Sequence, residues 1–235
     1  MRKAIGRLKK DIHLLAKIKN SKLIVSAGMP RSGSTLLFNM VRLLLLEKIK
    51  DDSKSSLSSC WISEISKTQE ASLYLVKTHR LSHLILQKSE MALYSYRDVR
   101  DALVSCHKKF GKPPSIETVR EWISQYNLAK KNSVKMIRYE DMIENMYFHI
   151  LNIERHLSLN LGEEDMQVIC QKLSSIDNQK ICSSDKRDFS SDTLLHTNHI
   201  TGTQVGEWES IIEKKLIDNI HREFKWWFIE NQYSI

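Results

Sequence analysis

Short apolar, β-branched runs alternate along the chain with longer stretches of helical character. Such runs are typical of strands that are buried on both faces of a sheet. The strands are predicted at residues 22–27 (KLIVSA), 73–77 (LYLVK), 91–96 (MALYSY) and 133–138 (SVKMIR). The helices are predicted at residues 35–48, 98–108, 115–131, 140–157, 163–174 and 208–230. Strands that alternate with helices predict an α/β fold, a single domain with a mostly parallel β-sheet flanked by helices.

Polar stretches separate some of these elements. Residues 53–59 (SKSSLSS) are dense in serine and residues 183–193 are mostly polar, so both predict loops. Residues 1–20 are basic, with apolar residues at helical spacing, and we expect a helical segment with a solvated basic face there. The domain itself is predicted to span residues 21–235.

The chain is basic, with 36 Lys and Arg against 28 Asp and Glu and a formal net charge of +8. A basic chain favours polyanionic ligands such as nucleic acid, acidic polysaccharide or a phosphate-rich cofactor. Most basic residues are spread along the chain and no RNP, C₂H₂ or basic-zipper signature occurs, so no nucleic-acid partner is predicted. No apolar run approaches the roughly 20 residues of a transmembrane segment. No secretory signal or N-x-[ST] site occurs either, so we expect a cytoplasmic protein.

A glycine-containing loop joins the first predicted strand to the first predicted helix, within residues 24–37 (IVSAGMPRSGSTLL). In this setting Gly33 can turn backbone N–H groups inward, and the N-terminus of the following helix adds its positive dipole. Three hydroxyl donors are available beside it, Ser32, Ser34 and Thr35. The segment therefore predicts an anion-binding loop.

The loop differs from the Walker A pattern G-x-x-x-x-G-K-[ST] in one respect that matters for chemistry. Gly28, Gly33 and Thr35 fit the pattern, but Ser34 stands where the lysine belongs. The cation is instead Arg31, inside the loop. The loop therefore favours a phosphate-type anion over ordinary ATP chemistry, and a P-loop small-molecule kinase is the alternative.

This loop resembles the P-[KR]-[ST]-G-[ST]-[ST] motif of the PAPS-dependent sulfotransferase family, which has a P-loop-like α/β fold. PAPS is 3′-phosphoadenosine-5′-phosphosulfate. The resemblance implies that the loop cradles the 5′-phosphate of PAPS and that its Arg31 neutralises the oxygen between phosphorus and sulfur. The cofactor-binding loop residues are then Arg31, Ser32, Gly33, Ser34 and Thr35.

A second motif of the family is an arginine at the end of a strand, followed eight residues later by a serine, which together bind the 3′-phosphate of the cofactor. Arg97 and Ser105 match it at the right separation. The chemistry is suitable, because a guanidinium offers phosphate a charge-assisted fork and a hydroxyl completes the site.

A third segment, residues 76–80 (VKTHR), is similar to a K-T-H segment at a strand end in the cytosolic branch of the family. The resemblance implies that His79 is the general base and that Lys77 stabilises charge on the sulfuryl group. Other branches use a glutamate from the region after the first helix, and Glu64 is the alternative base here.

The resemblance implies a sulfotransferase that moves a sulfuryl group from PAPS to a hydroxyl or amine acceptor by in-line displacement, leaving 3′,5′-diphosphoadenosine (PAP). The acceptor is expected to be a small molecule or a carbohydrate, and the scheme requires no metal. The late loop near Thr201, Gly202 and Thr203 lacks the Arg-Lys pair found in the cytosolic branch. A sulfotransferase-like protein that binds the cofactor without transfer activity is therefore a further alternative.

Overall fold

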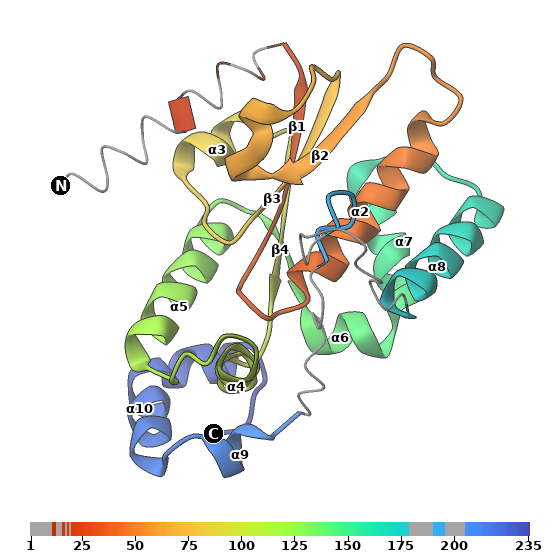
Figure 1. Cartoon of the computed structure of the whole chain (residues 1–235). Coiled ribbons are helices and arrows are strands. Elements are labelled where there is room, and N and C mark those ends of the chain that lie inside the picture. The colour runs from red at the N-terminus through yellow and green to blue at the C-terminus, as the bar shows by residue number, and fades with distance from the viewer. Residues whose placement is uncertain (1–10, 13–15, 17, 19, 179–189, 196–204) are drawn as a thin grey trace.

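A parallel β-sheet forms the centre of the computed structural model, which describes residues 11–12, 16, 18, 20–178, 190–195 and 205–235 (Figure 1). The strands are β1 (Lys22–Gly28), β2 (Leu57–Trp61), β3 (Leu73–Thr78), β4 (Met91–Tyr96) and β5 (Lys135–Arg138). Within the described residues the sheet has five strands in the order β2-β3-β1-β4-β5, and every neighbouring pair is parallel. The predicted α/β fold is confirmed.

Helices cover both faces of this sheet (Figure 1). One face carries α2 (Ser34–Ile49), α6 (Tyr139–Glu144), α7 (Met146–Leu157) and α8 (Glu163–Asn178). The other carries α3 (His83–Lys88), α4 (Val99–Phe110), α5 (Ile116–Lys131) and α10 (Lys214–Glu230). The short elements are the 3₁₀ helix η1 (Ile62–Lys67) after β2, and α9 (Trp208–Ile211), which packs beside α4.

The central strand β1 shows why the sequence folds this way. Leu23, Val25 and Ala27 enter the core under α4, α5 and α10, whereas Ile24 enters the core under α2, α7 and α8. All four side chains are buried, because a parallel sheet with helices on both sides leaves neither face to water. The unbroken apolar run of β1 is the sequence counterpart of this position.

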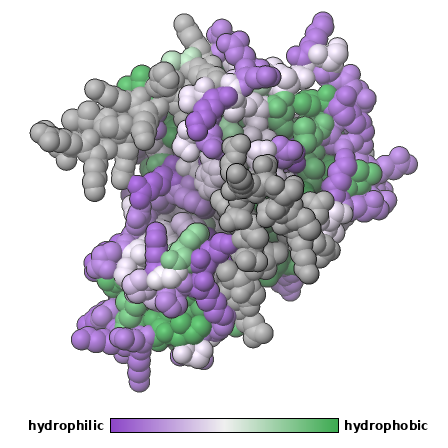
Figure 2. Space-filling model, viewed as in Figure 1, coloured by the Kyte–Doolittle hydropathy of each residue, from purple (hydrophilic) through white to green (hydrophobic). Residues whose placement is uncertain are grey.

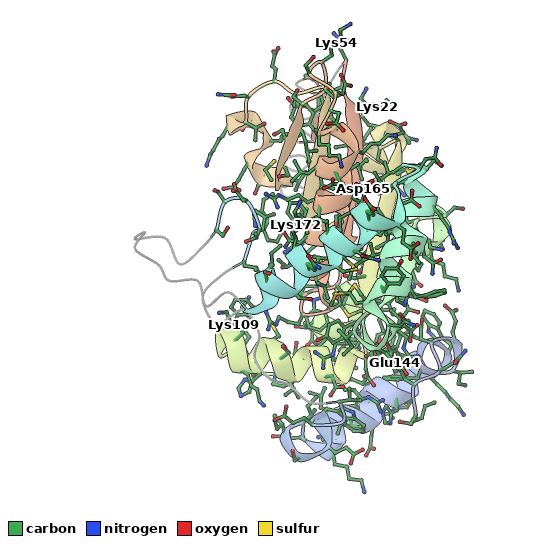
Figure 3. All side chains as sticks on the ribbon, turned by 90° about the vertical axis from the view of Figure 1, so that its right-hand side faces the viewer. Lys22, Lys54, Lys109, Glu144, Asp165 and Lys172 are labelled. Atoms are coloured by element: carbon green, nitrogen blue, oxygen red, sulfur yellow. The ribbon has the colours of Figure 1, made fainter. Side chains whose placement is uncertain are left out.

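Helix α8 closes the α2 side of the molecule. Its outward face carries Asp165 and Lys172 (Figure 3). The Nζ atom of Lys50 lies 2.9 Å from Oδ1 of Asp165, and the Nζ atom of Lys172 lies 3.4 Å from Oε2 of Glu47 in α2. Exposed pairs of this kind contribute little to stability, because solvent and salt screen them. Apolar contacts between α2 and α8 therefore provide most of the stability of their packing.

The prediction of a loop at residues 53–59 is wrong for its second half, because β2 begins at Leu57. Strand β2 lies at the edge of the sheet and pairs only with β3. Its side chains are mostly only partly buried, so an edge position accommodates the serines that made the segment look like a loop. The sequence pattern did not predict α3, a short helix whose first turn is capped by the hydroxyl of Ser82.

Two predicted helices are each interrupted. The helix predicted at residues 140–157 breaks at Asn145, whose side chain accepts the N–H of Phe148 at 3.1 Å and so caps α7. The helix predicted at residues 208–230 divides into α9 and α10, with Ile212 and Glu213 in extended or irregular backbone between them.

The described surface is largely hydrophilic, with apolar side chains gathered near α10 at the lower left and near α2 at the upper right (Figure 2). No helix in the described part of the chain is both long and apolar enough to cross a membrane. Most of the helical segment predicted at residues 1–20 lies outside the described residues, as does most of the polar stretch 183–193.

Candidate active site

Polar side chains replace apolar ones at the carboxyl ends of the three central strands. On the face covered by α2, Ser26 of β1 is in register with Lys77 of β3. Ser95 of β4 is in register with Gly28 on the other side of β1. All three side chains are buried. Ligands of open α/β sheets bind at this edge, so the polar groups mark the expected position of a site.

The loop after β1 is held tightly against β4. A Cβ atom on Gly28 would lie 2.2 Å from Ser95 Oγ and 2.8 Å from Ser34 Cβ, so only glycine fits there. The hydroxyl of Ser32 lies 2.7 Å from the carbonyl oxygen of Met29 and 2.9 Å from that of Ser95. The amide of Ser32 also donates to Met29 O. Ser32 therefore fastens the loop, and the direct cofactor contact predicted for it stays a prediction.

The turn into α2 has the features of an anion-binding loop. Arg31 and Gly33 both take left-handed backbone conformations, with φ of 65° and 69°. Such residues turn backbone N–H groups toward a common point. Gly33 offers no side-chain cap to α2, and the first turn of α2 holds no acidic residue. The backbone N–H groups of Ser34 and Thr35 therefore lie at the N-terminal end of α2, where a negatively charged ligand is favoured.

Arg31 connects this loop to α4. Its Nε atom donates a hydrogen bond to Ser105 Oγ at 2.9 Å, so two residues predicted at different phosphates touch each other. Burial lowers the pKa of Arg31, and the nearby positive charge of Arg97 lowers it further. Like charges held close together are unfavourable unless an anion lies between them or beside them. The pair is thus a candidate site for a multiply charged anion.

Lys77 lies deep in the same site, with 1% of its surface exposed. Its Nζ atom donates to Thr35 Oγ1, and it lies 4.5 Å from the centroid of the Trp61 ring. Burial lowers the pKa of Lys77 to about 7, and the positive charge of Arg31 contributes to the shift. Lys77 therefore loses its proton more readily than an exposed lysine and holds it more firmly when an anion is near.

His79 follows β3 and is also oriented by the loop. Its Nδ1 atom lies 2.8 Å from the carbonyl oxygen of Gly28. Since a carbonyl oxygen only accepts, Nδ1 carries the proton and Nε2 is the free acceptor in the neutral ring. Burial is the main reason why the pKa of His79 is lowered to about 4, and the charges of Lys77 and Arg31 contribute to the same shift. The ring is therefore neutral at pH 7, although part of it remains accessible to solvent.

Arg97 lies between β4 and α4 and is 4% exposed. Its guanidinium is 4.7 Å from the ring centroid of Tyr139, which also lies against Gly33. On α4, Asp101 approaches Arg97 to 4.0 Å and accepts the N–H of Gly206 at 3.2 Å. Burial raises the pKa of Asp101 to about 6, against the lowering effect of the Gly206 hydrogen bond and of Arg97. Tyr139 and Asp101 thus fix Arg97 between the loop and α4.

The remaining predictions fall at the margin of the site or beyond it. Glu64 lies in η1, partly buried, and none of the described contacts joins it to Lys77, His79 or Arg31. Thr201, Gly202 and Thr203 lie outside the described residues. In the described part of the chain no group of three or more His, Cys, Asp and Glu side chains could hold a metal ion.

Sequence reasoning missed three residues of this site, Trp61, Asp101 and Tyr139. Trp61 is the last residue of β2 and pairs in register with Lys77. No motif marks it, and only the strand order places β2 beside β3. Tyr139 contacts both Gly33 and Arg97, and these contacts depend on the three-dimensional fold.

A family model described as "Sulfotransferase domain" matches residues 113–232, about half of the chain. The match runs from the segment before α5 to the end of α10. The anion-binding loop, Lys77, His79 and Arg97 all precede it and were identified independently of it. No curated protein matches the chain.

Solved structures with the same fold align over most of the chain. Mouse sulfotransferase SULT7A1 complexed with PAP aligns with a TM-score of 0.63 and 16% identity, over 92% of this chain and 88% of that one. Retinol dehydratase in complex with androsterone and the inactive cofactor PAP aligns with a TM-score of 0.61 and 15% identity, over 87% and 79%. Retinol dehydratase with retinol and PAP gives 0.60 and 17%, over 88% and 80%. At these identities the likeness establishes the fold.

Proposed function

Because this chain belongs to the sulfotransferase family, we propose that it transfers a sulfuryl group from PAPS to a hydroxyl or amine acceptor by in-line displacement. The acceptor class proposed is a small molecule or a carbohydrate. The catalytic domain proposed spans residues 21–235, with the basic segment 1–20 as an appendage.

One observation carries the proposal. The positive charges of Arg97 and Lys77 are both close enough to that of Arg31 to depress a pKa, and His79 lies beside the same group. These residues come from the loop, from β3 and from the segment between β4 and α4. Three buried or half-buried cations around one helix N-terminus favour a ligand with several negative charges, and a neutral histidine beside them supplies a base.

The residues present fit PAPS at both of its anionic ends. The amides of Ser34 and Thr35 would hold the 5′-phosphate, and Arg97 with Ser105 would hold the 3′-phosphate. When bound, PAPS supplies an activated sulfuryl group whose leaving oxygen becomes negatively charged. The proposed role of Arg31, steadied by its hydrogen bond to Ser105, is to stabilise that charge.

His79 is the proposed general base. Its bond to Gly28 O leaves Nε2 free to take the acceptor proton. A pKa of about 4 makes His79 a weak base, and burial is the main cause, with a contribution from the charges of Lys77 and Arg31. Neutralisation of both cations by a bound anion would remove their part of the shift, while the larger effect of burial would remain. Donor binding would thereby make His79 a stronger base.

Lys77 is the proposed partner of the sulfuryl oxygens. Its ammonium group is buried between Thr35 and the Trp61 ring, where solvent competes little for its charge. A charge placed in such surroundings acts more strongly than one in water. Its depressed pKa means that an anion nearby brings it to full protonation.

Calorimetric titration of the full chain tests the cofactor. PAP is the ligand, and ATP with magnesium is the control. We expect PAP to bind and ATP to bind far more weakly. Binding and turnover of ATP in place of PAP would overturn the proposal in favour of a kinase, and binding of neither would remove the nucleotide site altogether.

Transfer itself is tested with ³⁵S-labelled PAPS and a panel of phenols, alcohols, amines and carbohydrates. His79→Ala is expected to lower turnover by about 10²- to 10⁴-fold while leaving PAP affinity nearly unchanged. Glu64→Gln is the matched control and should keep its turnover. The reverse pattern would make Glu64 the base. PAP binding by a wild-type chain that transfers to no acceptor would identify a cofactor-binding protein without activity.

A further inference from the structure

Trp61 is the one aromatic residue in the described structure for which contacts with both Lys77 and His79 are resolved. It ends β2 directly beside Lys77 of β3, and side chains in register on parallel strands point to the same face. The Lys77 ammonium lies 4.5 Å from the centroid of its indole ring. The His79 ring lies 5.3 Å from the same indole at 60°, in an edge-to-face arrangement.

The surroundings of Lys77 make the Trp61 indole important for stabilising the charge of its ammonium group. Lys77 is almost wholly buried, and in the described structure its charged atom meets a hydroxyl, on Thr35, and an aromatic face, with no carboxylate in an ion pair. A carboxylate there would cancel the positive charge and repel an anionic donor. The electron-rich face of tryptophan attracts an ammonium group without carrying a net charge of its own.

The second contact constrains the imidazole of His79. Its Nδ1 atom is fixed by Gly28 O, but a single hydrogen bond leaves the ring free to rock about that bond. The edge-to-face contact with Trp61 removes this freedom, because such ring pairs have a preferred orientation. The direction in which Nε2 points therefore depends on Trp61.

We propose that Trp61 is a positioning residue for sulfuryl transfer, which holds the Lys77 ammonium against its ring face and sets the orientation of the His79 imidazole. It acts through these two groups and needs no contact with the acceptor. The proposal rests on the proposed function for the reaction it serves, but both contacts exist in the protein without cofactor and are tested there.

The sharpest test keeps the shape of the Trp61 ring and lowers the electron density on its face. A tetrafluorinated tryptophan is placed at position 61, because fluorine withdraws electron density from the ring face and weakens its attraction for a cation. The ε-carbon of Lys77 is then titrated by NMR in the full chain without ligand. We expect its pKa to fall by about one unit, since the charged form loses its partner.

The matched control is the same fluorinated residue at Trp208, whose ring faces a different cation, Arg100, at 4.0 Å. That substitution should leave the Lys77 titration as in the wild type. An unchanged Lys77 titration with the fluorinated ring at position 61, or an equal shift from both positions, would overturn the proposal.

A second pair of variants separates positioning from packing. Trp61→Leu is expected to lower kcat by about 10- to 100-fold, to shift its pH profile, and to leave PAP affinity within a few-fold. Trp122→Leu removes a buried indole from the opposite face of the sheet and should lower stability without moving the pH profile. A Trp61→Leu enzyme with the wild-type pH profile and kcat would show that Trp61 only packs.

The positioning role of Trp61 and the proposed function can fail separately. If fluorination at Trp61 shifts the Lys77 titration but the wild type transfers nothing from PAPS, the positioning contact stands and the proposed function falls. If the wild type transfers sulfuryl and Trp61 variants behave as wild type, the function stands and this inference falls.

Discussion

Replacement of Gly33 by alanine should be far more damaging than the same replacement at Gly111, although both glycines have nearly the same backbone conformation. Their φ angles are 69° and 66°. A Cβ on Gly33 would lie 2.6 Å from Tyr139 Cδ2 and 2.8 Å from Met142 Cε. A Cβ on Gly111, after α4, meets nothing within 4 Å. The pair therefore separates backbone strain from steric overlap.

The expected magnitudes follow from these two contributions. The left-handed conformation costs about 1–2 kcal/mol for any residue with a Cβ, and both variants bear this cost. Overlap with packed side chains adds about 1–3 kcal/mol at Gly33 alone. For a chain of this size each kcal/mol lowers Tm by about 2–4 °C. Gly33→Ala should thus unfold roughly 2–12 °C below Gly111→Ala.

The overlap also has a functional signature. The Tyr139 ring that a Cβ on Gly33 would displace faces the Arg97 guanidinium at 4.7 Å. Gly33→Ala should therefore weaken PAP binding, whereas Gly111→Ala should not. Thermal unfolding and calorimetric titration measure the two effects on the same samples. Equal Tm values with equal PAP affinities would refute the claim that Tyr139 constrains the loop.

Three further predictions concern the start of α4. Arg100→Met should destabilise the protein by about 3–5 kcal/mol in urea unfolding, because it leaves the buried Asp98 carboxylate unpaired. The control Arg120→Met, at an exposed pair, should change stability far less. Burial raises the pKa of Asp101 to about 6 from 3.8, so the folded state holds that proton more tightly than the unfolded chain. The resulting stability is fully present below about pH 4 and is lost as pH rises through 6, a slope that Asp101→Asn should remove. Arg97→Gln should weaken PAP about 10- to 100-fold by calorimetry, and an affinity equal to wild type would remove Arg97 from the cofactor site.

The sequence predicted those parts of the fold that depend on local pattern. Strand β1 is recognisable because both of its faces are apolar, and the loop after it because Gly33 precedes a strong helix. Strand β2 was not recognisable, since an edge strand with one neighbour tolerates serine. The breaks at Asn145 and after α9 depend on capping and on tertiary packing, which outweigh helical periodicity.

The candidate site was predictable as a set of residue types but not as an arrangement. Arg31, Lys77 and Arg97 were each identified from a local motif, and the structure brings them within electrostatic reach of one another. The inward direction of Ser32 was not predictable, because a hydroxyl in such a loop can point either way. Trp61 was not predictable either, because its role depends on which strand lies beside β3.

The strand order has a consequence for the growing polypeptide. Strand β1 lies between β3 and β4, which are both made after it. At about 5–20 residues per second, a ribosome needs several seconds to pass from Gly28 to the end of β4 at Tyr96. Both edges of this apolar strand lack a partner until β3 is complete at Thr78, and the edge that pairs with β4 lacks one until Tyr96. Such an edge pairs readily with other chains. Soluble yield should therefore respond to translation rate and to chaperone supply more strongly than to the stability of the finished fold.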